Sequence, residues 1–148
     1  MIGGLVALKV DPNIMAKLAG QRMSMIVTGT NGKSTTTRMA ANALRTAYTV
    51  ATNDGGDNMD AGIVSALNQD LDADAICLEV DEMHVPHVMD ALSPTVLVLL
   101  NLSRDQLDRV GEINTIERRL REAVAAHPDT IVVANCDDMM VTSAAYDA

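Results

Sequence analysis

The stretch Met25-Ile-Val-Thr-Gly-Thr-Asn-Gly-Lys-Ser-Thr35 places an apolar run before two glycines, a lysine and two hydroxyl residues. The apolar run at 25–28 predicts a short buried strand, and residues 33–47 predict a helix. Gly29 and Gly32 allow backbone N–H groups to approach an anion without interference from a Cβ atom. The first turn of the helix directs its free N–H groups and the positive end of its dipole toward the same point. The stretch therefore predicts a phosphate-binding loop between a strand and a helix.

Further apolar runs alternate with helix-like segments along the rest of the chain. Strands are expected at 48–52, 75–80, 95–100 and 130–134, and helices at 59–67, 85–92 and 115–126. Strands that are apolar on both faces and separated by helices indicate a parallel sheet that is covered on both sides. With right-handed crossovers, the predicted fold class is α/β, a doubly wound and mostly parallel sheet with a P-loop.

Two of the expected helices have apolar residues along one face. The faces are formed by Met39, Ala43 and Ala47 in helix 33–47, and by Ile116, Leu120 and Val124 in helix 115–126.

Residues 1–20 form a separate lead-in before the domain, a short apolar run followed by a helix that begins at Asp11-Pro12 and extends through Leu18. Residues 21–148 are expected to form the domain itself.

The composition indicates one globular domain. The chain has 148 residues, 48% of them hydrophobic, and no apolar run approaches the roughly 20 residues that cross a bilayer. The N-terminus lacks the pattern of a secretory signal, so a cytoplasmic location is expected. A net charge of −9 and the lack of Phe and Trp argue against a nucleic-acid partner. Cys77 and Cys136 lie in apolar runs, and we expect them to be small buried residues without a metal or redox role.

Polar residues follow every expected strand. The segments are 29–35, 53–58, 79–82, 101–108 and 135–138, and all are rich in Gly, Asn, Asp or Glu. In such a sheet, ligands bind outside the carboxyl ends of the strands. The five segments are therefore expected to converge on one site.

The residue types in these segments suggest particular roles. Lys33 would reach the β- and γ-phosphates of a nucleoside triphosphate, and the Ser34 hydroxyl would coordinate magnesium. Thr35, Thr36 and Thr37 are read as first-turn hydroxyls near phosphate. Glu79 is the preferred carboxylate for magnesium, with an ordinary acidic strand end as the alternative. For Asp81 and Glu82 that ordinary interpretation is favoured.

Other polar residues leave alternatives open. His84 and His87 are read as exposed helix residues in preference to zinc ligands. The segment after the fourth strand has two interpretations: a solvated, salt-bridged helix start, or a second cation or phosphoryl contact through Asp105, Asp108, Arg104 and Arg109. Asn135 suits an adenine edge. For Asp137 and Asp138, capping of the next helix is favoured over a nucleotide contact.

Taken in order, these segments resemble a known family. Thr28–Thr35 resembles the ATP loop of the Mur ligases and folylpolyglutamate synthases. Leu78–Glu82, Asn101–Glu112 and Asn135–Asp138 are most similar to the MurT-type subunits of lipid II isoglutaminyl synthases. Gln106 stands where ordinary Mur ligases carry a histidine. The resemblance extends from about Gly3 to Asp138.

The resemblance implies ATP and Mg²⁺ as cofactors and an ATP-dependent amidation. In that family ATP activates the D-glutamate α-carboxyl of lipid II, and ammonia from a GatD-like glutaminase subunit gives D-isoglutamine. Lys33, Glu79 and Asp105 would be catalytic, and Ser34 and Glu79 would coordinate the metal. The implied nucleotide-binding residues are Gly29, Thr30, Asn31, Gly32, Lys33, Ser34, Thr35, Asn58, Asn135 and Asp138.

The chain departs from the family pattern in two places. Met139 stands where the family normally has a proline, and the sequence ends at Ala148, before the family's four-cysteine zinc ribbon and C-terminal domain. We therefore expect 21–148 to be the ATP-binding core of such an enzyme. The alternatives are a catalytically incomplete nucleotide-binding module, or a fragment of another Mur ligase-like or folylpolyglutamate synthase-like ATPase. An unrelated GTPase is disfavoured, since no Asn-Lys-x-Asp motif is present.

Overall fold

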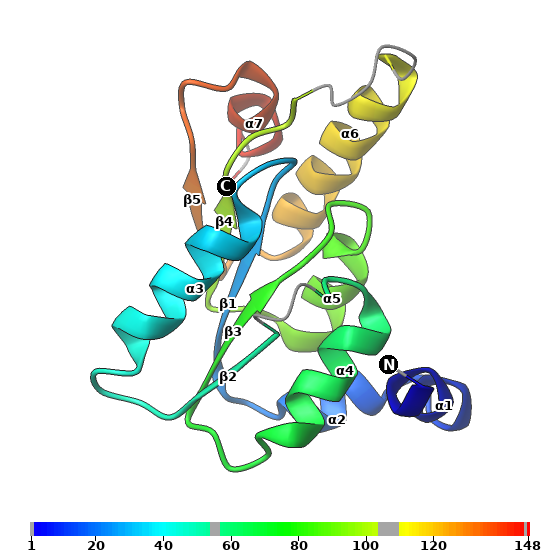
Figure 1. The fold of residues 1–148 in the computed structure, drawn as a ribbon. Helices are drawn as coiled ribbons and strands as arrows, with labels where there is room; N and C mark the ends of the chain where they lie inside the picture. Colours follow the sequence, from blue (N-terminus) through cyan, green and yellow to red (C-terminus); the bar gives the residue numbers. More distant parts are fainter. Residues whose placement is uncertain (1, 54–56, 104–109, 147) are drawn as a thin grey trace.

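A five-stranded parallel sheet organises the protein (Figure 1). The computed structural model describes residues 2–53, 57–103, 110–146 and 148. The strands are β1 (Met23–Thr28), β2 (Val50–Thr52), β3 (Ala75–Glu79), β4 (Val96–Leu99) and β5 (Ile131–Ala134). They pair in the order β2-β3-β1-β4-β5, and every pairing is parallel. The predicted α/β class with a parallel sheet is confirmed.

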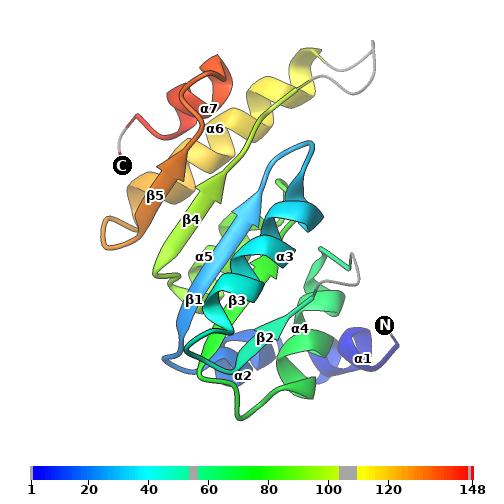
Figure 2. The ribbon, with the colours of Figure 1, turned by 60° about the vertical axis from the view of Figure 1, so that its left-hand side comes forward.

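Helices lie on both faces of the sheet, but the predicted cover is incomplete at the edge strand β5, where Ile131 and Val133 are 60% and 52% exposed. The described helices are α1 (Ile2–Val10), α2 (Ile14–Ala19), α3 (Lys33–Leu44), α4 (Asp60–Gln69), α5 (Val85–Leu92), α6 (Val110–Ala126) and α7 (Met139–Ala144). Figure 2 shows α3 in front of the sheet and α4, α5 and α6 behind it. Each of these four helices connects two parallel strands, which is the doubly wound arrangement expected from the sequence.

The larger part of the core lies behind the sheet. Ile26, Leu78 and Leu97 of three adjacent strands are fully buried there against the helices, together with Leu120 of α6. Burying one such side chain contributes about 1.5–3 kcal/mol, so this layer supplies most of the hydrophobic stabilisation. The apolar side predicted for α6 is confirmed, since Leu120 and Val124 are buried and Ile116 packs against them.

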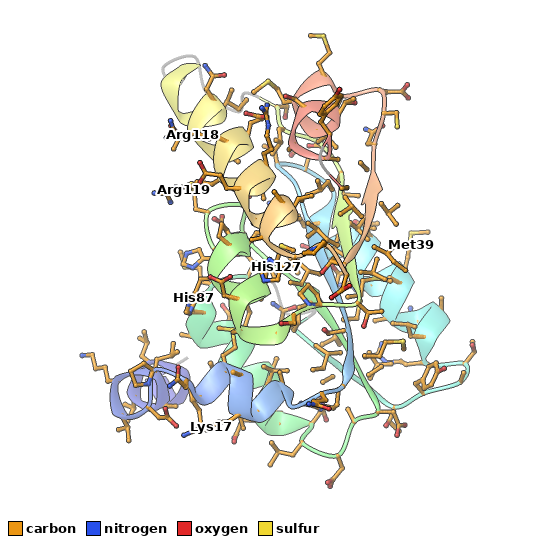
Figure 3. The ribbon with its side chains drawn as sticks, turned by 180° about the vertical axis from the view of Figure 1, so that it is seen from behind. Lys17, Met39, His87, Arg118, Arg119 and His127 are labelled. Atoms are coloured by element: carbon orange, nitrogen blue, oxygen red, sulfur yellow. The ribbon has the colours of Figure 1, made fainter. Side chains whose placement is uncertain are left out.

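The face predicted for α3 was wrong. Its buried residues are Thr37 and Ala41, whereas Met39 is 68% exposed and Ala43 is also exposed (Figure 3). The loop before α3 fixes the first helical residue at Lys33, and this sets which side faces the sheet. Thr37 therefore packs over β3, where its carbonyl lies 3.7 Å from the Cys77 sulfur, so it is not among the hydroxyls at the phosphate loop.

The lead-in is helical and packs against the domain. The apolar run forms α1, and α2 begins at Ile14 because Asp11 instead accepts the Asn13 N–H at 3.0 Å. Both helices contact α4. A Cβ on Gly4 would lie 2.1 Å from the Ala61 carbonyl oxygen, so α1 approaches α4 at a glycine.

The two cysteines differ in their surroundings. Cys77 is buried in β3 as predicted, but Cys136 is exposed in the turn after β5, so that half of the prediction was wrong. Cys136 lies two residues beyond Ala134, where β5 ends, and so falls outside the apolar run of the strand. Within the described residues, no helix has the length and apolar character that crossing a membrane requires.

Candidate phosphate-binding site

The described parts of the segments that follow the strands lie at one edge of the sheet, because all five strands run in the same direction (Figure 2). Within their described parts, Lys33 is the only basic residue. Among the described residues of these segments, an anion therefore meets one positive side chain, together with the N-terminus of α3.

The loop between β1 and α3 depends on its two glycines. Gly29 has φ 141° and Gly32 has φ 88°, values that residues with a Cβ rarely adopt. A Cβ on Gly29 would also lie 2.9 Å from the Asn101 nitrogen. Gly32 is the N-cap of α3, so no side chain caps the helix. The N–H groups of its first turn have no carbonyl partner within the helix.

The segment after β4 fastens this loop. The Asn101 side chain accepts the Asn31 N–H at 2.9 Å and donates to the Asn31 carbonyl at 2.8 Å. The Asn101 carbonyl accepts the Thr30 N–H at 2.8 Å. The Ser103 N–H donates to the Thr30 hydroxyl at 3.0 Å. The N–H groups at 30 and 31 are thus used, and those that follow Gly32 remain the candidates for an anion.

Lys33 lies over the loop that precedes it. Its ammonium donates to the Gly29 carbonyl at 2.6 Å and to the Thr30 carbonyl at 3.3 Å. It also lies 3.5 Å from a carboxylate oxygen of Glu82. Neighbouring Ser34 and Thr35 are exposed. Lys33, Ser34 and Thr35, which the sequence predicts to contact phosphate, thus form the first turn of α3.

Glu79 ends β3 and is almost completely buried at 3% exposure. One of its carboxylate oxygens accepts the Asn58 amide at 3.2 Å. The other, Oε2, is buried and has no hydrogen-bond partner in the part of the chain that the structure describes. A buried carboxylate oxygen without a donor is a site where a cation would be stabilised.

Sequence reasoning placed Asn53 in the segment 53–58 but gave it no role; in the structure it positions Glu79. The Asn53 side chain donates to the Glu79 carbonyl at 2.8 Å and accepts the Glu79 N–H at 2.8 Å. It also donates to the Asp57 carbonyl at 2.9 Å. Asn53 thus continues the pairing of β2 with β3 after β2 has ended. The available sequence signal was an asparagine directly after a short apolar strand.

The segment after β5 is arranged around Asp138. One carboxylate oxygen accepts the N–H groups of Met140 and Val141, at 2.9 and 3.1 Å, and so caps α7. The other accepts the Leu102 N–H at 2.9 Å. The favoured capping interpretation is confirmed for Asp138. Asn135 is exposed and donates to the Leu100 carbonyl at 2.9 Å.

The two histidines pair with a carboxylate, and the candidates after β4 lie outside the described residues. His84 and His87 both contact the carboxylate of Asp60, at 3.0 and 3.7 Å. Across the described ranges, no group of three or more His, Cys, Asp or Glu side chains forms a metal cluster. The candidates Arg104, Asp105, Gln106, Asp108 and Arg109 lie outside the described residues.

A separate cavity of about 450 Å³ lies between α5 and α6. Its lining includes His87 and Asp90 of α5 and Arg119 and Glu122 of α6. Figure 3 shows His87 and Arg119 on the side of the sheet opposite α3. None of the glycine-loop residues lines this cavity.

The sequence of this chain is similar to sequences of the Mur ligase family, which its motifs already resemble. The family profile of the Mur ligase middle domain matches residues 27–148. The MurT subunit of lipid II isoglutaminyl synthase (glutamine-hydrolyzing) from Streptococcus pneumoniae is 36% identical over 139 residues, which cover 90% of this chain and 31% of that protein. The chain spans about a third of the length of the curated relatives it matches.

Solved structures are similar in fold. A crystal structure of MurF from Acinetobacter baumannii has a TM-score of 0.76 at 21% identity and covers 95% of this chain and 33% of its own. MurF ligase from Thermotoga maritima, in complex with ADP, has a TM-score of 0.69 at 25% identity, with coverages of 83% and 31%. The first likeness concerns the fold alone.

Proposed function

The chain belongs to the Mur ligase middle-domain family, and on that premise we propose that residues 29–35 bind the phosphates of ATP. The observation that carries the proposal is the start of α3, where Lys33 follows a glycine N-cap with φ 88°. The helix N-terminus and the ammonium place positive charge beside N–H groups that have no helical partner. The ADP complex of the similar MurF ligase supports a nucleotide in this fold.

Magnesium fits the residues beside this loop. Hard cations prefer oxygen ligands, and magnesium usually takes only one or two carboxylates from the protein. Glu79 offers a buried oxygen that has no donor among the described residues, Asn58 donates to the other oxygen, and Ser34 offers an exposed hydroxyl. Ser34 and Glu79 would hold the ion, which would neutralise phosphate charge. Asn58 is thereby a positioning residue for the metal ligand.

For the adenine, Asn135 is the better candidate of the two residues after β5. It is exposed, whereas both carboxylate oxygens of Asp138 already accept backbone N–H groups. A contact from Asp138 to the nucleotide would compete with the cap of α7.

The whole protein would use ATP to activate a carboxylate in peptidoglycan synthesis, as the names of the MurT relatives suggest. A carboxylate oxygen of the D-glutamate residue in lipid II attacks the γ-phosphorus, and ADP leaves. Ammonia from a GatD-like glutaminase subunit then displaces inorganic phosphate, which gives D-isoglutamine. Lys33 would neutralise charge on the transferring phosphoryl group. Asp105 is the further catalytic candidate.

Calorimetric titration with Mg-ATP tests the binding proposal. The wild type should bind, and Lys33→Ala should weaken binding by at least about tenfold, since a desolvated charge pair is lost. Lys17→Ala is the matched control, because Lys17 is exposed on α2 and pairs with Asp11 (Figure 3). Equal affinities of the two variants would refute the assignment of Lys33. Binding without phosphate release in the presence of lipid II and a glutaminase subunit would favour a nucleotide-binding module.

A further inference from the structure

Glu82 is a buried carboxylate that the proposed function does not use. It lies in the turn between β3 and α5 and is 8% exposed. Hydrogen bonds fix the backbone of this turn. Asp81 donates its N–H to the Asn58 carbonyl at 2.9 Å, and its own carbonyl accepts the His84 N–H at 2.9 Å. The backbone on both sides of Glu82 is therefore fixed, and its carboxylate lies beside Lys33 of the phosphate loop.

The partner of Glu82 is Lys33. The ammonium and the carboxylate oxygen are 3.5 Å apart, and the two side chains are only 13% and 11% exposed. An ammonium has three N–H donors. Two of them are directed to the carbonyls of Gly29 and Thr30. A phosphate oxygen that binds Lys33 must therefore displace one of these three partners or share the ammonium with it.

The charge of each partner of Lys33 decides which contact a bound phosphate disturbs most. The two carbonyls are neutral, while Glu82 carries the same sign of charge as phosphate, so the two anions repel each other across Lys33. Because this pair is mostly shielded from water, the repulsion is screened less than at an exposed surface. Neutralising Glu82 would free Lys33 and remove the repulsion, and both effects strengthen phosphate binding.

We propose that Glu82 competes with ATP for Lys33 and thereby lowers nucleotide affinity, which favours nucleotide release. This inference rests on the proposed function, because it concerns the same loop. Glu82 is a positioning residue that acts through Lys33.

The test is the Kd for Mg-ATP of Glu82→Gln, which retains the size of the side chain and removes its charge. Asp81→Asn is the matched control, since it removes one charge from the adjacent residue, whose carboxylate accepts the Met83 N–H. Circular dichroism and thermal unfolding check that each variant folds. Glu82→Ser is a second neutral variant if the glutamine variant unfolds.

We expect Glu82→Gln to bind Mg-ATP about tenfold more tightly than the wild type, and Asp81→Asn to change the Kd by less than about threefold. The gain should persist when ionic strength rises from about 0.05 M to about 0.5 M. Unchanged or weaker binding by the neutral variants would overturn the role of Glu82. Failure of the wild type itself to bind Mg-ATP would instead refute the proposed function.

Discussion

Replacing Asn53 by alanine should lower stability and nucleotide binding together. Asn53 is 6% exposed, and its side chain donates to the Glu79 carbonyl and accepts the Glu79 N–H, at 2.8 Å each. Alanine leaves that N–H and that carbonyl without a partner where water does not reach. Each unpaired buried group costs about 1–3 kcal/mol, so the free energy of unfolding should fall by about 2–6 kcal/mol. This is a large share of the stability of a small domain.

Urea unfolding followed by circular dichroism measures this loss. Asn68→Ala is the matched control, because Asn68 is exposed on α4 and its replacement should change the unfolding free energy by less than about 0.5 kcal/mol. Mg-ATP binding should weaken in Asn53→Ala, since Glu79 is no longer fixed at the end of β3. A change for Asn53→Ala as small as that of the control would refute the reasoning.

Three further predictions concern other parts of the site and the core. Gly29→Ala should cost about 1–3 kcal/mol of stability and weaken Mg-ATP binding, because φ is 141° and a Cβ would lie 2.9 Å from the Asn101 nitrogen; unfolding and titration measure this. Gly62→Ala should cost about 1–3 kcal/mol, since its Cβ would lie 2.4 Å from the Asp57 carbonyl oxygen, whereas Gly3→Ala in α1, with no atom within 4 Å, should be neutral or stabilise by up to about 1 kcal/mol; equal melting temperatures would contradict this. Burial raises the pKa of the Cys77 thiol to about 11, so at neutral pH iodoacetamide should label exposed Cys136 first and Cys77 only on unfolding, as mass spectrometry of the peptides would show. The thiol of Cys77 stabilises the fold below its unfolded pKa, and this contribution declines as pH rises toward 11.

The sequence predicts the sheet well because its strands are apolar on both faces. An apolar run of this length is stable mainly when both of its faces are buried, as in a parallel sheet. The predicted bounds of the five strands agree with the observed bounds within about two residues. The glycine loop was predictable for a related reason, since positive φ and close approach to Asn101 both require glycine.

What the sequence could not predict depends on tertiary contacts. The apolar stripe Met39-Ala43-Ala47 has helical spacing, yet the loop geometry turns it toward solvent. Asn53 and Glu82 look like ordinary polar residues after strands. Only the packed structure shows that Asn53 completes the β3 ladder and that Glu82 faces Lys33.

Amide NMR of the ¹⁵N-labelled chain during titration with Mg-ATP tests the central claim most directly. We predict that the largest shift changes occur at the amides of 29–35, with Glu79 following as its carboxylate gains a cation. Changes concentrated at His87 and Arg119, beside the cavity between α5 and α6, would contradict the account. A spectrum that does not change at saturating Mg-ATP would contradict it as well.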